Sequence, residues 1–108
     1  GGVVIKHNAN QHYTTDAVSE ALFMEICRRA DVPVQHFANR SDLAGGSTLG
    51  SISNTRVAMN TVDVGLAQLA MHSACETAGV ADTAALVHAA SAFYNTAIRV
   101  EADGVYGI

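Results

Sequence analysis

Asp42 and His72 have the side chains in this sequence that are best suited to ligate a divalent metal ion. Asp42 lies just beyond a predicted strand and next to a glycine-rich turn, and open α/β sheets bind ligands at the C-terminal ends of their strands. His72 stands between an apolar run and a predicted helix start, where an imidazole held by a neighbouring group can ligate a metal. Two plainer interpretations stay open. Asp42 could cap Ser47 or Thr48, and His72 could be a half-buried histidine hydrogen-bonded to backbone.

Other residues with reactive side chains give weaker signals. Lys6 ends a predicted strand, where its ammonium group would bind an anionic substrate or face solvent. Residues 45–48 (GGST) form a turn that could cradle phosphate, but the GxxxxGK[ST] pattern is absent, as are HExxH and a nucleophile elbow. The remaining histidines are His7, His12, His36 and His88; we interpret His88 as structural or solvent-facing. The sequence therefore assigns no catalytic acid, base or nucleophile to this chain.

Strands and helices that alternate along the chain must position these residues. The β-branched run at 3–5 predicts a first strand, and residues 34–38 and 61–65 are also interpreted as short strands, with a weaker strand pattern in the tail. Helices are predicted from an N-cap among residues 14–16 to a point before Pro33, over 49–59, just after His72, and over about 82–95. The capping-box spacing of Ser73 and Glu76 supports the helix after His72. The alternation indicates one α/β domain over residues 1–108, with helices packed on a mostly parallel sheet.

Composition excludes several classes of function. The net charge is −4 with scattered basic residues, so there is no basic face to bind nucleic acid. No apolar run approaches the roughly 20 residues that span a bilayer, and no signal peptide precedes the first strand. Cys27 and Cys75 form no CxxC pair, which favours free thiols and a cytoplasmic location. The hydrophobic share of 49% is high for a short chain, so we expect part of the surface to pack against another polypeptide.

Five short segments carry a more specific pattern. They are residues 5–17 (IKHNANQHYTTDA), 39–42 (NRSD), 46–50 (GSTLG), 62–65 (VDVG) and 68–73 (QLAMHS). In this order and spacing they resemble the aspartyl aminopeptidase family of two-metal zinc aminopeptidases. The resemblance covers residues from about Val4 to about Tyr94. It implies the C-terminal portion of a catalytic domain with a phosphorylase/hydrolase-like fold, and the missing initiator Met fits a chain that begins within a longer protein.

The resemblance implies a cytosolic metallo-aminopeptidase that removes N-terminal Asp or Glu residues from peptides and assembles into homo-oligomers. It also implies two divalent metals, usually zinc, which polarise the scissile carbonyl and activate a water, and a Glu that acts as general base. Asp42 falls on the carboxylate ligand of one metal, and His72 falls on the imidazole ligand of the other. Lys6 falls on a position that contacts substrate, and Ser47 and Thr48 would line the site without ligating metal.

The number of ligands limits what this chain is expected to do alone. A catalytic zinc needs about three protein ligands, whereas the matched segments supply about one for each metal. The family's other ligands and its general base precede the matched region. Two positions also depart from the family pattern: His12 stands where it has Arg, and Ala44-Gly45 stand where it has Pro-Cys. We therefore expect the 108-residue chain to be inactive in isolation. The alternative is a non-catalytic α/β module that acts through self-association.

Overall fold

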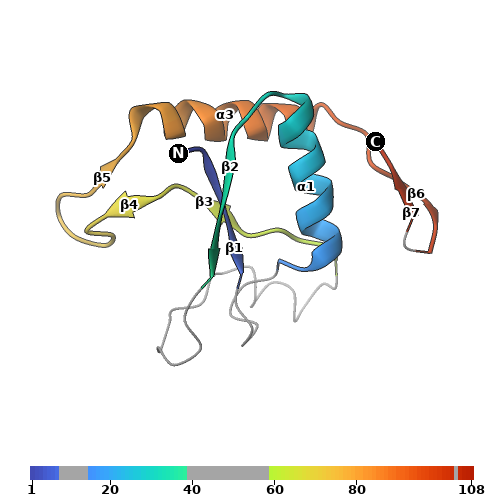
Figure 1. Cartoon of the computed structure of the whole chain (residues 1–108), viewed down its shortest axis with the longest axis horizontal. Helices are drawn as coiled ribbons and strands as arrows, with labels where there is room; N and C mark the ends of the chain where they lie inside the picture. Colours follow the sequence, from blue (N-terminus) through green and yellow to red (C-terminus); the bar gives the residue numbers. More distant parts are fainter. Residues whose placement is uncertain (8–14, 39–58, 104) are drawn as a thin grey trace.

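The computed structural model describes residues 1–7, 15–38, 59–103 and 105–108, in which helices and short strands form a layered structure (Figure 1). Strands β1, β2 and β3 make the central sheet, while β4–β5 and β6–β7 are separate hairpins. No described helix is long and apolar enough to cross a membrane. The helix expected over 49–59 lies outside the described residues, apart from Met59. In chain order the elements are β1 (Val3–His7), α1 (Ala17–Arg29), β2 (Val34–Ala38), β3 (Val64–Gly65), β4 (Gln68–Leu69), β5 (Thr77–Ala78), α3 (Val80–Tyr94), β6 (Arg99–Ala102) and β7 (Val105–Gly107).

The central sheet has the order β2-β1-β3 and is mixed. β1 pairs with β2 in parallel, from Val3 opposite Val34 to His7 opposite Ala38. β1 pairs with β3 in the antiparallel direction, with Val4 opposite Gly65. Both hairpins are antiparallel as well. Among the described strands, the expected parallel pairing is therefore met only by β1 and β2, which α1 connects as a crossover helix.

Helix α1 begins where its sequence provides a cap. Asp16 is the N-cap, and its Oδ1 accepts a hydrogen bond of 2.8 Å from the backbone N–H of Ser19. The Ser19 hydroxyl in turn accepts one of 3.0 Å from the N–H of Asp16, which completes a capping box. The helix ends at Arg29, and Asp31 turns the chain with φ of 56° before Pro33. The predicted start among residues 14–16 and the predicted end before Pro33 are both confirmed.

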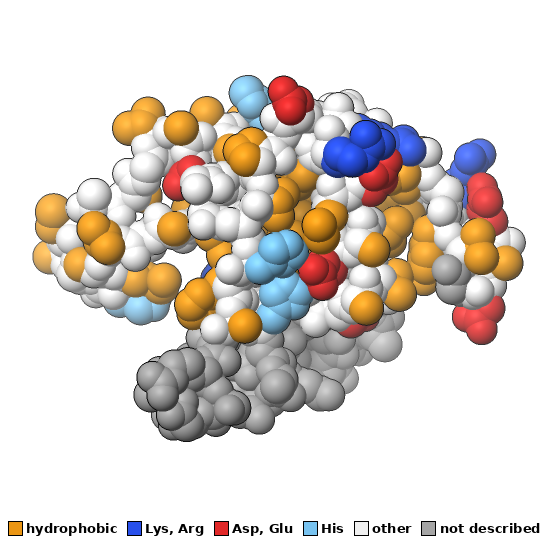
Figure 2. Space-filling model, in the orientation of Figure 1, with side chains coloured by type: hydrophobic (Ala, Val, Ile, Leu, Met, Phe, Trp, Pro, Cys, Tyr) orange, Lys and Arg blue, Asp and Glu red, His pale blue; other side chains and the backbone are white. Residues whose placement is uncertain are grey.

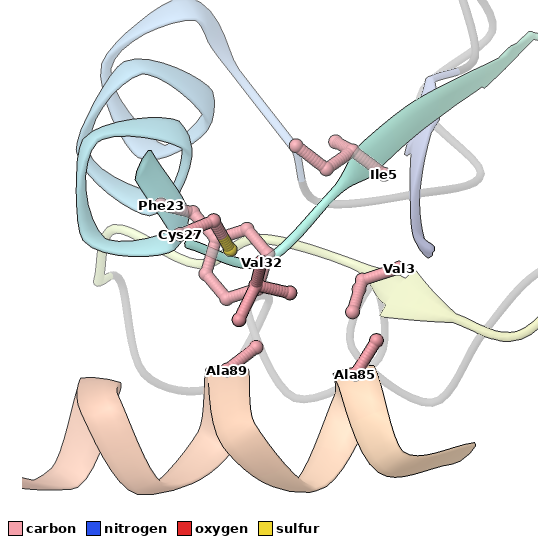
Figure 3. Close-up of a cluster of buried hydrophobic side chains, with 7 residues drawn as sticks. All are labelled: Val3, Ile5, Phe23, Cys27, Val32, Ala85 and Ala89. Atoms are coloured by element: carbon pink, nitrogen blue, oxygen red, sulfur yellow. The ribbon is translucent and has the colours of Figure 1, made fainter. Parts of the chain in front are cut away.

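The hydrophobic core lies between the sheet and the two helices. Val3 and Ile5 project from β1 on the same face of the sheet, because side chains alternate along a strand. Phe23 and Cys27, one turn apart on α1, point to the same centre. Figure 3 shows the small side chains of α3 closing the cluster, which consists of Val3, Ile5, Phe23, Cys27, Val32, Ala85 and Ala89. Alanine at both α3 positions lets the helix backbone approach the sheet closely.

Helix α3 contacts the core cluster through the middle of its length. It runs across the strands near one end of the sheet (Figure 1), with Ala85 and Ala89 buried. Toward its C-terminus, Tyr94 is 83% exposed. The carboxylate of Asp82 in its first turn accepts a hydrogen bond of 2.6 Å from the backbone N–H of Gly2. This bond ties the start of β1 to α3, although the two lie far apart in sequence.

The helix predicted just after His72 is wrong, because β4 and β5 form a hairpin there. Ser73 and Glu76 do not form a capping box. Instead the Ser73 hydroxyl donates to the carbonyl of Cys75 at 2.7 Å, and the Glu76 carboxylate accepts from the backbone N–H of His72. Both side chains thus stabilise the turn in place of a helix start. The strand predicted over 61–65 is shortened to β3, with Thr61 forming an isolated bridge to Thr15.

Candidate metal and substrate site

Lys6 is held beside Asp63 on the central sheet. Its Nζ lies 3.8 Å from Oδ1 of Asp63, whose side chain is only 11% exposed. Its backbone N–H donates to the carbonyl of Asp63 at 2.9 Å, and the N–H of Asp63 donates to the Thr15 hydroxyl at 2.8 Å. The alternation along β1 places the Lys6 side chain on the face opposite Val3 and Ile5. The ammonium group is therefore a half-buried cation in a defined position, and any bound carboxylate there would share it with Asp63.

His72 lies in the turn of the β4–β5 hairpin, with its side chain exposed. Its φ is 70° and that of Ala70 is 56°, a left-handed conformation that residues other than glycine rarely adopt. The turn holds this conformation through two bonds: the N–H of His72 donates to Glu76 Oε1 at 2.6 Å, and the N–H of Ser73 donates to the carbonyl of Ala70 at 3.0 Å. Strained backbone of this kind often occurs at binding sites.

The exposure of His72 bears on the plainer interpretation of this residue. Within the described ranges its imidazole makes no hydrogen bond, so it is not a half-buried histidine satisfied by backbone. An exposed imidazole with both ring nitrogens available is a donor that zinc accepts. The other predicted site residues, Asp42, Ser47 and Thr48, lie outside the described residues. The structure therefore shows where His72 and Lys6 lie, and the prediction that Asp42 and His72 each ligate one of two metals stays a prediction.

A second cluster of polar side chains includes His7 at the C-terminal end of β1 and His36 in the middle of β2. His7 Nε2 is 3.1 Å from His36 Nδ1, and the two rings stack with centroids 5.4 Å apart. Oε1 of Glu20, in the first turns of α1, lies 3.8 Å from His7 Nε2 and 3.5 Å from His36 Nδ1. In Figure 2, histidine and acidic side chains adjoin near the middle of the face, where β1 and β2 run. This group is called the His7–Glu20–His36 cluster below.

Sequence reasoning left the His7–Glu20–His36 cluster unassigned. Because side chains alternate along a strand, the sequence alone does not say on which face of the sheet His36 lies. The missing information was the register: Ile5 opposite His36 and His7 opposite Ala38 put both histidines on one face, two residues apart along the strands. Two strands joined by a crossover helix would have suggested parallel pairing. The sequence alone does not set which residues stand opposite each other.

An apolar hollow of about 580 Å³ opens between α1, α3, the segment before β3 and the β6–β7 hairpin. Large hydrophobic residues near it are exposed, with Phe93 at 43% and Val100 at 70%. Figure 2 shows hydrophobic side chains reaching the surface at several places on the visible face. A contiguous apolar surface on a small chain usually marks a contact with another polypeptide. The residues that line this hollow include Leu22, Phe23, Ile26, Met59, Val64, Leu86, Phe93 and Tyr106.

Comparison with known proteins identifies the class to which this chain belongs. A family model described as "Aminopeptidase I zinc metalloprotease (M18)" matches residues 1–94. The class is thus that of metallo-aminopeptidases, which are hydrolases. The chain belongs to the M18 family of zinc metalloproteases. The resemblance inferred from the five sequence segments is confirmed at the level of this family.

Individual relatives match most of this chain, but the match covers only a small part of each relative's own length. The "Probable M18 family aminopeptidase 2" of Pseudomonas aeruginosa (strain UCBPP-PA14) is 48% identical over 94 residues, which are 87% of this chain and 22% of the relative. The protein of the same name from Clostridium novyi (strain NT) gives the same identity and coverage. This chain therefore spans about a fifth of the length of the curated relatives that it matches.

Solved structures confirm the fold. The cryo-EM structure of the Ape4 and Nbr1 complex aligns with a TM-score of 0.83 at 41% identity, covering 86% of this chain and 18% of that one. The crystal structure of prApe1 aligns with a TM-score of 0.81 at 32% identity, covering 86% and 20%. The arrangement of helices and sheets described above is thus shared with larger aminopeptidase chains.

Proposed function

We propose that this chain is the C-terminal portion of a metal-dependent aminopeptidase that removes N-terminal Asp or Glu residues from peptides. Membership of the M18 family over residues 1–94 carries this proposal. In it, His72 ligates one zinc ion of a two-metal site, and Asp42 ligates the other. When bound, the two metals polarise the scissile carbonyl and activate water. The position of His72, exposed on a strained turn with an unbonded imidazole among the described residues, supports its role.

Lys6 is proposed to contact the acidic side chain of the substrate. The Lys6 side chain is 26% exposed, and its Nζ lies 3.8 Å from Oδ1 of Asp63. A positioned cation in a partly buried setting attracts a carboxylate more strongly than one in bulk water. Asp63 keeps the ammonium in place and partly offsets its charge, so binding would favour an acidic residue without excluding others. Ser47 and Thr48 line the site in this proposal and ligate no metal.

The 108 residues are proposed to be inactive alone. One imidazole and one carboxylate do not complete either zinc site, which needs about three protein ligands. The remaining ligands and the general base would come from parts of the catalytic domain that the longer relatives possess. The apolar hollow between α1 and α3 supports this, because it offers a surface against which such parts can pack. Assembly of the whole protein into homo-oligomers in the cytoplasm is part of the same proposal.

A chimera tests the proposal. Residues 1–94 replace the matching segment of the Pseudomonas aeruginosa relative, and hydrolysis of Asp-, Glu- and Leu-terminated chromogenic peptides is measured with and without added zinc or cobalt. We expect metal-dependent turnover of the acidic substrates by the chimera and none by the 108-residue chain. His72→Ala and Asp42→Ala should each abolish turnover and remove about one metal per chain, as measured by mass spectrometry.

Two further variants sharpen the experiment. Lys6→Met should raise KM for the Asp and Glu substrates and leave that for the Leu substrate nearly unchanged. His88→Ala is the matched control, because His88 is an exposed histidine on α3. Turnover by the isolated chain, or full activity of the His72→Ala chimera, would contradict the proposal.

Self-association without catalysis is the second candidate function. The observation that favours it is the exposed apolar surface, with Val80 at 89% and Leu69 at 72% exposure. Sedimentation velocity at several concentrations separates the two candidates. A well-folded monomer at all concentrations would exclude the association module. A concentration-dependent oligomer of the chain, together with an inactive chimera, would favour it over the aminopeptidase.

A further inference from the structure

We infer that the His7–Glu20–His36 cluster is a binding site for one divalent transition-metal ion, separate from Asp42 and His72. The three donor atoms form a triangle with edges of 3.1, 3.8 and 3.5 Å. Zinc binds imidazole nitrogen at about 2.0–2.1 Å and carboxylate oxygen at about 2.0–2.2 Å in a tetrahedron, whose ligand–ligand edges are then about 3.3–3.5 Å. The average edge of the triangle already matches this geometry, so an ion would require only small side-chain movements.

Three structural elements hold the donors in place. His7 and His36 project from the same face of the β1–β2 pair, whose parallel register is continuous from Val3 to His7. Glu20 lies in the first turns of α1, and the capping box between Asp16 and Ser19 fixes where that helix starts. Metal sites built on strands and helices lose less conformational entropy on binding than sites on loops. The cluster is therefore preorganised before any ion arrives.

The donor set selects the class of metal. Two imidazoles and one carboxylate suit Zn²⁺, Co²⁺, Ni²⁺ and Cu²⁺, whereas Mg²⁺ and Ca²⁺ prefer all-oxygen sites. The side chains of His7, Glu20 and His36 are 30%, 29% and 44% exposed, so an ion can enter and keep a water as its fourth ligand. In the described part of the chain, the ion pairs of Glu20 are only with these two histidines. No Lys or Arg among the described residues therefore competes for its carboxylate.

The cluster differs from the proposed catalytic site in its residues and in its consequence. It contains neither Asp42 nor His72, and the alternation along β1 puts His7 and Lys6 on opposite faces of the sheet. An ion there would join β1, β2 and α1, three elements that also build the core. Because it would bind the folded chain and not the unfolded one, it would stabilise the fold. The inference thus goes beyond the proposed peptidase activity and does not depend on it.

The test uses the 108-residue chain with two background changes, His72→Ala and Cys75→Ser, which remove the exposed imidazole and the exposed thiol of the turn between β4 and β5. Zinc and cobalt are titrated by calorimetry, by cobalt visible absorption, and by NMR of the histidine rings. We expect one ion per chain, with paramagnetic broadening of His7 and His36 and a higher unfolding midpoint.

Single variants and a matched control decide the outcome. His7→Ala and His36→Ala should weaken binding by roughly 10- to 100-fold or more, a range that loss of a supporting group alone can produce. His88→Ala should leave binding unchanged. Far-UV circular dichroism checks that each variant is folded, and His36→Gln replaces His36→Ala if that variant is not. Undetectable binding by the background chain, or binding that survives the loss of both histidines, would overturn the inference.

Discussion

The thiol of Cys27 should report on the integrity of the core. Cys27 is fully buried and Cys75 is exposed. Burial raises the pKa of the Cys27 thiol, which lowers the fraction of reactive thiolate below that of an exposed cysteine. A thiol reagent should therefore modify Cys75 rapidly and Cys27 only when the structure opens. If opening costs about 5 kcal/mol, the low end for native domains, Cys27 should react at least about a thousandfold more slowly than in the unfolded chain.

The perturbation that tests this core is Phe23→Ala. Phe23 is 6% exposed and lies one helical turn from Cys27. Burial of about 200 Å² of aromatic surface at about 25 cal/mol per Å² gives an upper estimate of about 5 kcal/mol. Measured Phe→Ala changes in cores cost about 3–5 kcal/mol. Since about 1.4 kcal/mol is a factor of ten, the protection of Cys27 should fall by at least a hundredfold.

The assay follows both thiols by mass spectrometry during alkylation, in the presence of a chelator. Met24→Ala is the matched control, because Met24 is on the same helix and 41% exposed. We expect this control to change the labelling rate of Cys27 by less than about tenfold, which corresponds to about 1.4 kcal/mol. Equal reactivity of Cys27 and Cys75 in the unaltered chain, or unchanged protection in Phe23→Ala, would refute the packing described here.

Two other predictions concern charge and backbone conformation. The hydrogen bonds from Arg28 and Arg29 lower the pKa of Glu25 from 4.5 to about 2. This carboxylate therefore contributes stability that is fully present above about pH 4.5 and is lost as the pH falls through about 2. Glu25→Gln should reduce the loss of stability between these pH values, as measured by urea unfolding at each pH. A pH profile of stability identical to that of the unaltered chain would contradict the ion pairs of Glu25 with Arg28 and Arg29. Gly2 has φ of 98°, and a Cβ there would lie 2.2 Å from the carbonyl oxygen of Pro33. Gly2→Ala should therefore destabilise the chain by more than about 1 kcal/mol, whereas Gly65→Ala, whose Cβ would meet only the flexible end of Lys6, should cost less in the same measurement.

The sequence determined the local elements whose causes are themselves local. The cap at Asp16, the apolar spacing on α1 and the stop before Pro33 set that helix. The strands at 3–5 and 34–38 were predicted within two residues of their observed ends. The failure after His72 also has a physical reason. Ser73 and Glu76 have the spacing of a capping box, but the pairing of Gln68 with Ala78 places this segment in a hairpin. The spacing of neighbouring residues does not reveal a contact between two strands.

Only the tertiary structure decided which distant segments of the chain lie next to each other. The sequence alone led to the resemblance to the aspartyl aminopeptidase family and to His72 as a candidate ligand, because those signals lie in contiguous motifs. The left-handed turn that exposes His72 and the pairing of Lys6 with Asp63 depend on the hairpin and on the β1–β3 register. The meeting of His7, Glu20 and His36 depends on how β1 and β2 align and where α1 crosses them. Register and crossing are fixed by packing across the whole core, so no single stretch of residues specifies them.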